Sequence, residues 1–396
     1  MALQYIDQAD IQGKRILARF DFNVPLDGAT ITDSSRIDMA LPTIKYILDK
    51  GVSQLILISH LGRPKGKPEA KYSLEPVAKY LAEQLKEDVL LTESALDEGI
   101  RTLQQLKKNK IILLENIRFH SEEEQNDFEF AKKIASYADL YVNDAFGVSH
   151  REHASVHALV AFFKDKSYAG FLIKKELEAL QKITENPKKP FMALVGGLKV
   201  SDKIKTLDRL LVSVDKLLIG GAMAYPFLKA QGIKIGASLC SPQDVALAQQ
   251  ILSRDKGNKI VLPTDHVAAK NLEGEAQFVS NQALPENLMG LDIGEKTIKN
   301  YTEILSQAKT IFWNGPMGLF ENPLFAKGTL AMARALADNQ GAFSLVGGGD
   351  SVSALNKSGL ADKISHVSSG GGASLEFIEK GSLPGISALR FGVSLP

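Results

Sequence analysis

Short apolar runs of four to seven residues recur along the chain, and most are followed by a turn and then by apolar residues at helical spacing. The runs lack polar alternation, which is typical of parallel strands covered on both faces. In the first half we predict strands at residues 16–22, 54–59, 110–115 and 140–143. In the second half we predict strands at 191–195, 216–219, 259–262, 310–313, 343–346 and near 366–368. Strands that alternate with helices predict doubly wound α/β domains.

A helix in the middle of the chain is a candidate connector between two domains. Residues 171–183 carry leucine and isoleucine at helical spacing with charges between them, and prolines interrupt the stretch that follows. The chain has 396 residues, a length that favours two or three domains. We therefore predict an interdomain helix and hinge at 171–190, between a first domain at 1–170 and a second at 191–381.

Two local patterns predict helix starts. Residues 73–86 have helical spacing, with Ser73 as a candidate N-cap and Pro76 in the first turns. The acidic run Glu122-Glu123-Glu124 predicts a solvated loop or the start of a helix, because like charges repel in a buried site.

Composition narrows the class of protein. The chain is 44% hydrophobic and 23% charged, as in soluble globular proteins, and its net charge of +1 offers no field that would hold nucleic acid or an anionic membrane. Cys240 is the only cysteine, which excludes an intrachain disulfide and fits a reducing cytosol. No apolar run is as long as a membrane span, and Asp7 and Asp10 lie where a signal peptide would be apolar. We expect a cytoplasmic protein with no nucleic-acid or membrane partner.

Most polar and glycine clusters follow the carboxyl end of a predicted strand, which is the edge where open α/β sheets bind ligands. Residues 1–170 hold seven of the eleven arginines but carry 22 Lys+Arg against 25 Asp+Glu, a net charge of −3. An anion site there must therefore be a local cluster. Asp21 and Asn23 lie at alternate positions of one strand end, so both point from the same face. Arginine side chains suit a small substrate with several negative charges.

The other candidates of the first half follow further strands. Arg36 lies in a polar loop at 33–36, and His60, Gly62 and Arg63 end another strand, while Arg118 and Arg151 follow two more. A single arginine more often makes a surface ion pair, and a single histidine is more often structural. Five basic residues placed after strand ends favour anion binding instead. The spacing of His150, His153 and His157 would also suit a metal, but neither a further cysteine nor an HExxH motif accompanies them.

The second half offers glycine turns at its strand ends. It has no GxxxxGK[ST] motif, and the triple glycine at 347–349 does not continue as GxGxxG, because Val352 occupies the third glycine position. A glycine turn that opens a helix presents free N–H groups to a phosphate. Asp350 beside it is a natural ligand for Mg²⁺, which prefers oxygen donors and shares them with substrate phosphates.

Two further segments of the second half suit a nucleotide. Lys199 and Lys203 follow Gly196-Gly197, and they face the same side if a helix begins near Lys199. Lysines at this spacing are commonly only solvated, but their place behind a glycine pair at a strand end favours phosphate contact. The turn at 314–318, with Glu321 beyond it, is a plausible but unspecific nucleotide wall. Two anion sites in two halves suggest an enzyme that passes a group between two phosphorylated molecules.

Eight ordered motifs identify a family. They are RFDFNVP (19–25), SHLGRP (59–64), LLENIRFH (113–120), VNDAFGVSHREH (142–153), GGLKVSDKI (196–204), WNGPMGLFE (313–321), GGGDS (347–351) and SSGGGASLE (368–376). Together they resemble phosphoglycerate kinase. The resemblance implies two Rossmann-like domains joined by a hinge helix, and a glycolytic enzyme that reversibly converts 1,3-bisphosphoglycerate and MgADP to 3-phosphoglycerate and MgATP. It also implies that the tail at 382–396 returns to the first domain.

The resemblance also implies a role for each matching residue. The phosphoglycerate would be held by Asp21, Asn23, Arg36, His60, Gly62, Arg63, Arg118 and Arg151. Arg36 would lie closest to the acyl phosphate, Lys199 would stabilise the phosphoryl group in flight, and Gly371 and Gly372, with Gly370, would form a second glycine cradle. The nucleotide would be bound by Gly197, Lys199, Lys203, Gly220, Gly221, Gly290, Asn314, Gly315, Pro316, Glu321, Gly348, Gly349, Asp350 and Ser351, with Asp350 as the Mg²⁺ ligand.

The implied mechanism is direct in-line transfer on domain closure. The acceptor oxygen is already ionised, so no general base is needed, and the protein must align its substrates and neutralise charge. We expect a monomer, because two domains that close on each other need no partner subunit. Leu198 stands where the family often has alanine, which adds bulk beside Lys199. Two alternatives are a nicotinamide-dependent oxidoreductase with a degenerate glycine loop and a binding protein on the same scaffold that has lost activity.

Overall fold

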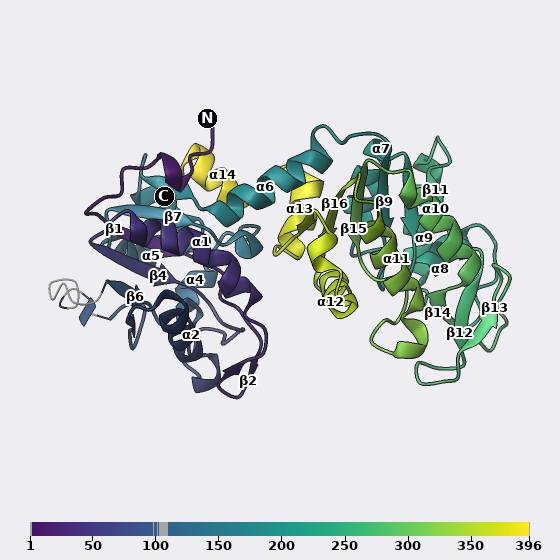
Figure 1. Cartoon of the computed structure of the whole chain (residues 1–396), viewed down its shortest axis with the longest axis horizontal. Helices are drawn as coiled ribbons and strands as arrows, with labels where there is room; N and C mark the ends of the chain where they lie inside the picture. Colours follow the sequence, from purple (N-terminus) through teal and green to yellow (C-terminus); the bar gives the residue numbers. More distant parts are fainter. Residues whose placement is uncertain (1, 98, 101, 103–109, 396) are drawn as a thin grey trace. The chain divides into compact units, whose positions relative to one another are not determined.

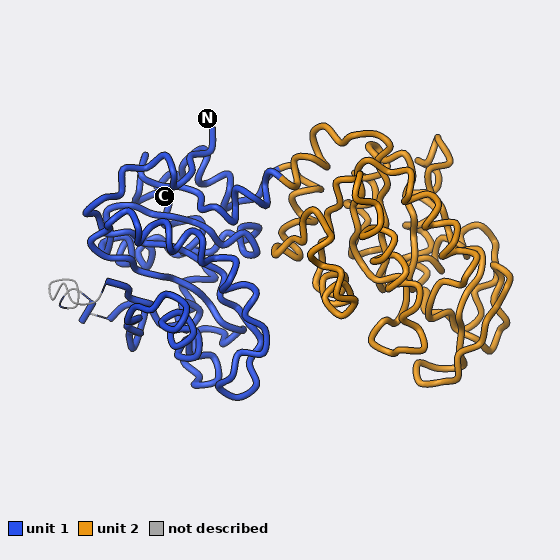
Figure 2. Tube along the Cα trace, in the orientation of Figure 1, with its two compact units in different colours: residues 1–178, 382–396 blue, residues 179–381 orange. Residues whose placement is uncertain are grey.

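The computed structural model describes residues 2–97, 99, 100, 102 and 110–395. The chain divides into two compact units, shown in Figure 2: unit 1 comprises residues 1–178 and 382–396, and unit 2 comprises residues 179–381. The division falls inside α6 (Phe171–Thr184). Within unit 1, α14 (Pro384–Phe391) of the tail packs against β8 (Ser167–Ala169), and Gly385 N donates to Ser149 O at 2.8 Å.

Unit 1 is built on a parallel sheet whose described strands lie in the order β5-β6-β4-β1-β7-β8. Figure 1 labels β1, β4, β6 and β7 of this sheet. Its strands are β1 (Arg15–Arg19), β4 (Gln54–Ile58), β5 (Val89–Leu91), β6 (Ile111–Leu113), β7 (Leu140–Asn143) and β8, and a hairpin of β2 (Leu26–Asp27) and β3 (Thr30–Ile31) lies outside the sheet. Its further helices are α1 (Ser35–Asp49), α2 (Glu75–Leu85), α4 (Ser121–Glu124) and α5 (Phe128–Ala135), with 3₁₀ turns η1 (Ile6–Gln8), η2 (Ala70–Tyr72), η3 (Ile117–Phe119), η4 (Phe146–Val148) and η5 (Ala158–Phe162). The order of the strands reverses between β1 and β7, which is where such sheets bind ligands.

Unit 2 repeats this plan with the strand order β11-β10-β9-β15-β16-β17, and the order reverses between β9 and β15. Its strands are β9 (Phe191–Val195), β10 (Lys216–Ile219), β11 (Ile260–Val261), β15 (Thr310–Asn314), β16 (Phe343–Gly347) and β17 (His366–Val367). Its further helices are α7 (Ile204–Ser213), α8 (Ala224–Ala230), α9 (Pro242–Arg254), α10 (Glu295–Ser306), α11 (Lys327–Asp338), α12 (Gly349–Ser358) and α13 (Gly372–Lys380), with η6 (Pro323–Phe325) and η7 (Ala361–Lys363). The predicted pair of doubly wound parallel sheets is confirmed.

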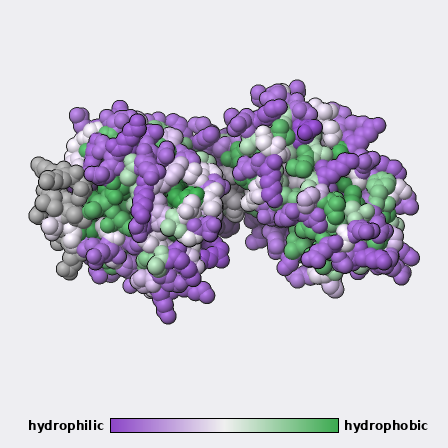
Figure 3. All heavy atoms as spheres, turned by 60° about the horizontal axis from the view of Figure 1, so that its bottom comes forward, coloured by the Kyte–Doolittle hydropathy of each residue, from purple (hydrophilic) through white to green (hydrophobic). Residues whose placement is uncertain are grey.

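The burial of the strands explains why their sequences do not alternate. Every residue of β4, β6, β7, β9 and β15 is buried, so these strands are covered on both faces. Unit 2 also carries an antiparallel sheet that the sequence does not predict, with β12 (His266–Ala269) between β13 (Gln277–Val279) and β14 (Met289–Ile293). The face drawn in Figure 3 is mainly hydrophilic, with apolar groups in separate patches. Among the described residues, no helix combines the length and the apolar character needed to cross a membrane.

The start of α2 differs from its prediction by one residue. The N-cap is Leu74 rather than Ser73, although Pro76 does lie in the first turn. The reason is the buried carboxylate of Glu115, which accepts from Leu74 N at 2.8 Å and from Ser73 Oγ at 2.7 Å. A strand-end carboxylate therefore takes the place of a serine cap.

Three basic residues also lie in other local structures than the sequence suggests. Arg36 is in the first turn of α1 and not in a loop, because α1 already begins at Ser35. The helix expected near Lys199 begins at Ile204, so Lys199 and Lys203 do not share a helix face. Residues 201–203 form a turn before this helix instead. Ser201 N of this turn donates to Asp244 Oδ1 of α9 at 3.0 Å.

Candidate active site

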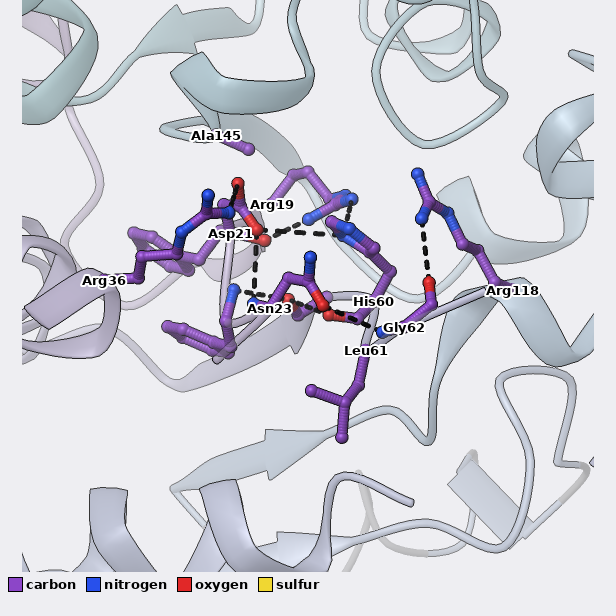
Figure 4. A network of polar contacts seen from close by, with 12 residues as sticks. Arg19, Asp21, Asn23, Arg36, His60, Leu61, Gly62, Arg118 and Ala145 are labelled. Carbon is purple, nitrogen blue, oxygen red and sulfur yellow. Dashed lines mark hydrogen bonds and ion pairs between the residues drawn. The ribbon is translucent and has the colours of Figure 1, made fainter. Parts of the chain in front are cut away.

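The predicted anion-binding residues of unit 1 that lie together beyond the carboxyl ends of β1 and β4 are Asp21, Asn23, Arg36, His60, Gly62 and Arg118 (Figure 4). Asp21 is central: its Oδ2 lies 2.8 Å from Nη1 of Arg36, and its Oδ1 accepts from Asn23 N at 3.2 Å. The same Oδ1 lies 3.9 Å from Nδ1 of His60. Asp21 is 8% exposed and Arg36 39%, so the arginine reaches solvent while its partner is largely covered.

Gly62 links this group to Arg118. Gly62 N donates to Asn23 Oδ1 at 2.8 Å, and Gly62 O accepts from Nη1 of Arg118 at 2.9 Å. Gly62 has a φ of +63°, and a Cβ at this position would lie 2.4 Å from the ring of Tyr72. Burial and the nearby Arg19 lower the pKa of Arg118. A buried guanidinium loses part of its hydration, and a bound anion would offset that loss, so Arg118 is suited to bind an anion.

Across the described residues, the two remaining predicted residues of unit 1 are not joined to this group of side chains. Arg63 follows Gly62 and is exposed, and Arg151 is exposed on the segment after η4. Within the described part of the chain, no hydrogen bond or ion pair joins either side chain to Asp21 or His60. Both side chains are exposed to solvent.

Arg19 belongs to the cluster but is not among the residues predicted from the sequence. Its side chain is fully buried, with Nε donating to Ser155 Oγ at 2.9 Å and Nη2 lying 3.1 Å from Nδ1 of His60. Nη1 donates to Phe20 O. The available signal was the position of this arginine inside an apolar run, which a surface arginine would not occupy.

The acidic run contains a second buried charge, so its predicted solvation is wrong for Glu123. The run does open α4, but Glu123 is fully buried, and its carboxylate accepts from Ser155 Oγ at 2.6 Å and from Ser155 N at 2.8 Å. Burial raises the pKa of Glu123, and the charge of Arg19 acts against that rise.

The neighbouring histidines lie among charged and polar groups. His153 Nδ1 lies 3.8 Å from Oε1 of Glu123, which is beyond hydrogen-bond distance, and burial and the charge of Arg118 lower the pKa of His153 to about 3. His157 Nδ1 lies 3.1 Å from Nδ2 of Asn126. In the residues that the structure describes, no three His, Cys, Asp or Glu side chains are grouped as metal ligands.

In unit 2, the loops after β9 and β15 contact each other through their backbones. Gly196 N donates to Asn314 O at 2.9 Å, and Gly197 N donates to Pro316 O at 3.1 Å. A Cβ on Gly196 would lie 2.0 Å from the carbonyl oxygen of Pro316, so only glycine permits this approach. Gly220 is packed in the same way, because a Cβ there would lie 2.4 Å from Sδ of Met317.

Lys203 supplies a partly buried positive charge beside these loops. Its Nζ donates to Gly196 O at 2.7 Å and to Asn314 O at 3.3 Å. Burial lowers the pKa of Lys203 to about 8, although Asp350 and Asp202 act in the opposite direction. Neutral carbonyl groups do not balance an ammonium charge, so this lysine favours an incoming anion. Lys199 is exposed.

The glycine clusters open two helices. Gly348, with a φ of +93°, precedes α12, and Gly371, with a φ of +50°, precedes α13, whose first residue is Gly372. Gly349 and Asp350 are exposed in the first turn of α12. The predicted residues beneath them are joined: Asn314 Nδ2 donates to Gly347 O at 2.8 Å, and Ser351 Oγ accepts from Gly315 N at 2.5 Å.

A mainly apolar cleft in unit 2 is lined by several of the residues predicted to bind the nucleotide. Among the predicted residues, those that line it are Gly197, Gly221, Gly290, Pro316, Glu321 and Asp350. Its apolar walls come from Leu198, Leu239, Leu272, Met289, Leu291 and Leu319. A Cβ on Gly290 would lie 1.7 Å from the hydroxyl of Tyr225, so this wall has no room for a larger residue. Polar groups at one end and apolar walls elsewhere are typical of a small-molecule site.

Each unit thus has groups suited to an anion at the carboxyl edge of a parallel sheet, arginines in one unit and glycine turns with a lysine in the other. These features define an α/β enzyme that acts on phosphorylated ligands. The phosphoglycerate kinase family model matches residues 6–381. The chain belongs to the phosphoglycerate kinase family. Its reaction is the reversible, glycolytic transfer of a phosphoryl group between 1,3-bisphosphoglycerate and ADP, and membership excludes the oxidoreductase alternative.

Relatives and solved structures of phosphoglycerate kinases are similar to this chain over almost its whole length. Phosphoglycerate kinase of Anaeromyxobacter sp. (strain Fw109-5) is 51% identical over 398 residues, which cover 98% of this chain and 100% of that protein. Phosphoglycerate kinase of Bdellovibrio bacteriovorus is 49% identical over 96% of each chain. The structure of the Coxiella burnetii enzyme has a TM-score of 0.89 at 40% identity, and that from Pyrococcus horikoshii OT3 has 0.83 at 31%. Each covers 98% of this chain and 99% of the solved one.

Proposed function

We propose that unit 1 binds the phosphoglycerate and that unit 2 binds the nucleotide. The observation that supports this division is the contrast between the two sites. In unit 1, arginine and histidine side chains gather around Asp21 and Gly62, which suits a short, highly charged ligand. In unit 2, an apolar cleft ends at Asp350 and the first turn of α12, which suits a base with a phosphate chain.

Phosphoglycerate binding is assigned to Asp21, Asn23, Arg36, His60, Gly62, Arg63, Arg118 and Arg151. Arg36 is placed nearest the acyl phosphate, because only its Nη1 is engaged by Asp21 and its side chain is 39% exposed. The other guanidinium N–H groups are then free to donate to phosphate oxygens. Arg118 and the exposed Arg63 and Arg151 supply further charge for the ligand.

Nucleotide binding is assigned to Gly197, Lys199, Lys203, Gly220, Gly221, Gly290, Asn314, Gly315, Pro316, Glu321, Gly348, Gly349, Asp350 and Ser351. A kinase that uses ADP and ATP works with Mg²⁺, and Asp350 fits that ion as an exposed carboxylate beside the helix amides that would receive the phosphates. When bound, Mg²⁺ neutralises phosphate charge and orients the phosphate chain. Lys203 would then lie opposite the phosphates with its charge only partly solvated.

The transfer itself is proposed to be direct and in line, on closure of the two units about a hinge at 171–190. Charge on the moving phosphoryl group would be met by Arg36, Lys199 and the amides of Gly371 and Gly372. The acceptor oxygen is ionised before it reacts, so no general base is assigned. Closure would also exclude water, which otherwise hydrolyses an acyl phosphate. We further propose that the enzyme acts as a cytoplasmic monomer without nucleic-acid or membrane partners.

Calorimetric titration of single variants tests the division of the two ligands. Arg118→Ala is expected to weaken 3-phosphoglycerate binding at least tenfold and leave MgADP binding unchanged, because one charge-assisted contact is lost. Asp350→Asn is expected to weaken MgADP binding and leave 3-phosphoglycerate binding unchanged. Arg254→Ala, which removes an exposed ion pair with Asp208, is the control. Loss of both ligands' binding in either folded variant contradicts the division.

A further inference from the structure

A row of buried polar groups lies behind His60. Glu123 accepts from Ser155 Oγ at 2.6 Å, Ser155 Oγ accepts from Arg19 Nε at 2.9 Å, and Arg19 Nη2 lies 3.1 Å from His60 Nδ1. Glu123, Ser155 and Arg19 are fully buried, and His60 is 3% exposed. Figure 4 shows the last step of the row, with Arg19 next to His60 and Asp21.

The chemistry of these groups fixes the direction of each hydrogen bond. A guanidinium has donors and no acceptor, so Arg19 must donate to both Ser155 and His60. Ser155 then gives its single hydroxyl proton to Glu123, which as a carboxylate only accepts. His60 Nδ1 must carry a lone pair, and the proton of a neutral imidazole must lie on Nε2.

The charges around His60 also favour its neutral state. The ionisable groups near His60 are Arg19 from β1, Asp21 after it, Arg36 from α1, Arg118 from η3 and His153 from the segment before η5. Burial lowers the pKa of His60 well below its ordinary value, and Arg19, Arg118 and Arg36 lower it further. Asp21 opposes them, but it is 3.9 Å from Nδ1, whereas Arg19 is at 3.1 Å.

We propose that Arg19, held by Ser155 and Glu123, is a positioning residue that keeps His60 neutral with its proton on Nε2. His60 then offers phosphoglycerate one fixed N–H donor whose state does not change across neutral pH. This inference rests on the proposed function of unit 1, because the ligand of His60 is assigned there. Without Arg19, the lone pair of Nδ1 has no obligatory donor, and Asp21 draws a proton to that nitrogen.

The test is the nitrogen NMR spectrum of His60 in the ligand-free full chain, with ¹⁵N-labelled histidine and with His60→Gln to assign the signals. We expect an unprotonated Nδ1 and a protonated Nε2 from pH 5.5 to pH 8.5. A proton on Nδ1, or titration of His60 within that range, overturns the proposal. This readout needs no turnover, so it is separate from any failure of the proposed function.

Variants extend the test to substrate binding. Arg19→Met/Glu123→Gln removes both buried charges together, so that neither is left unpaired, and we expect His60 to titrate near neutral pH. The KM for 3-phosphoglycerate should rise on the order of tenfold at pH 8 and become pH-dependent, with a smaller change in kcat. Ser155→Ala should shift the same signals in the same direction. Arg15→Met, on the same strand but paired with Asp139, should leave them unchanged. Folded variants with an unaltered His60 signal and KM refute the role of Arg19.

Discussion

Asp292 gives unit 2 a stability that depends on pH. This residue of β14 is 2% exposed, and its carboxylate accepts from Gly328 N at 2.6 Å and from Ile293 N at 2.9 Å. Burial raises the pKa of Asp292 to about 7, although both amide hydrogen bonds act to lower it. Asp292 also lies next to the apolar cleft of unit 2, since Gly318 lines that cleft and a Cβ on Gly318 would contact Oδ1 of Asp292 at 2.4 Å.

The sign and size of the effect follow from proton linkage. The pKa of Asp292 is about 7 in the folded chain and 3.8 in its ordinary state, so the folded state binds more protons between these values. The free energy of unfolding therefore falls as pH rises through this window and is level above it. The difference between the two pKa values corresponds to about 4 kcal/mol in full, of which about 3 kcal/mol falls between pH 5 and pH 8.

Urea unfolding of the intact chain and of Asp292→Asn measures this effect. Trp313 is the only tryptophan, and it lies in the same core cluster as Ile293, so its fluorescence reports the unfolding of unit 2. The difference in unfolding free energy between the two proteins should change by about 3 kcal/mol from pH 5 to pH 8, with the unsubstituted chain losing stability. Asp338→Asn, at an exposed site, should show no such change. A difference that stays constant across this range refutes the reasoning.

Three further predictions concern the two sites. Because the pKa of Lys203 is about 8, its charge is lost above that pH, and the KM for MgATP should rise there in the intact chain but not in Lys203→Met. Gly62→Ala places a side chain at a φ of +63° against Tyr72, so thermal unfolding should show a loss of at least about 1 kcal/mol and the KM for 3-phosphoglycerate should rise. Gly290→Ala should push Tyr225 and weaken MgADP binding in calorimetry without affecting 3-phosphoglycerate. The first prediction is contradicted by a KM for MgATP that stays constant above pH 8, and the second by an unchanged KM for 3-phosphoglycerate in Gly62→Ala. The third is contradicted by an unchanged MgADP affinity in Gly290→Ala.

Long apolar runs made most of the fold predictable from the sequence. The strands at Phe191–Val195 and Lys216–Ile219 begin and end where predicted, because all but one of their residues are buried and the runs end at glycine or a loop. β5 and β8 have three residues each and are only partly buried, so they leave no clear apolar run. The antiparallel sheet of β12, β13 and β14 was missed because its edge strand β13 is largely exposed.

The candidate site was predictable where a polar residue follows or ends a strand, as Asp21 and His60 follow β1 and β4 and Asn314 ends β15. The parallel register brings such residues to one edge without further information. Arg19 and Glu123 were not predictable in this way. Their burial depends on Ser155, which is far away in the sequence and lies between the two charges only after folding. Pairing of buried charges is a tertiary property that a local pattern does not contain.

The most direct test of the central claim is a coupled turnover assay on the purified chain. It receives 3-phosphoglycerate and MgATP, and formation of the acyl phosphate is followed through NADH consumption by added glyceraldehyde-3-phosphate dehydrogenase. Turnover should require Mg²⁺ and fall at least about 100-fold in both Arg36→Ala and Lys199→Ala, because each removes a charge that we propose to stabilise the moving phosphoryl group. Lys132→Ala, which removes an exposed ion pair with Glu129, should keep full activity. Full activity in folded Arg36→Ala or Lys199→Ala would contradict the division of the transferring site between the two units.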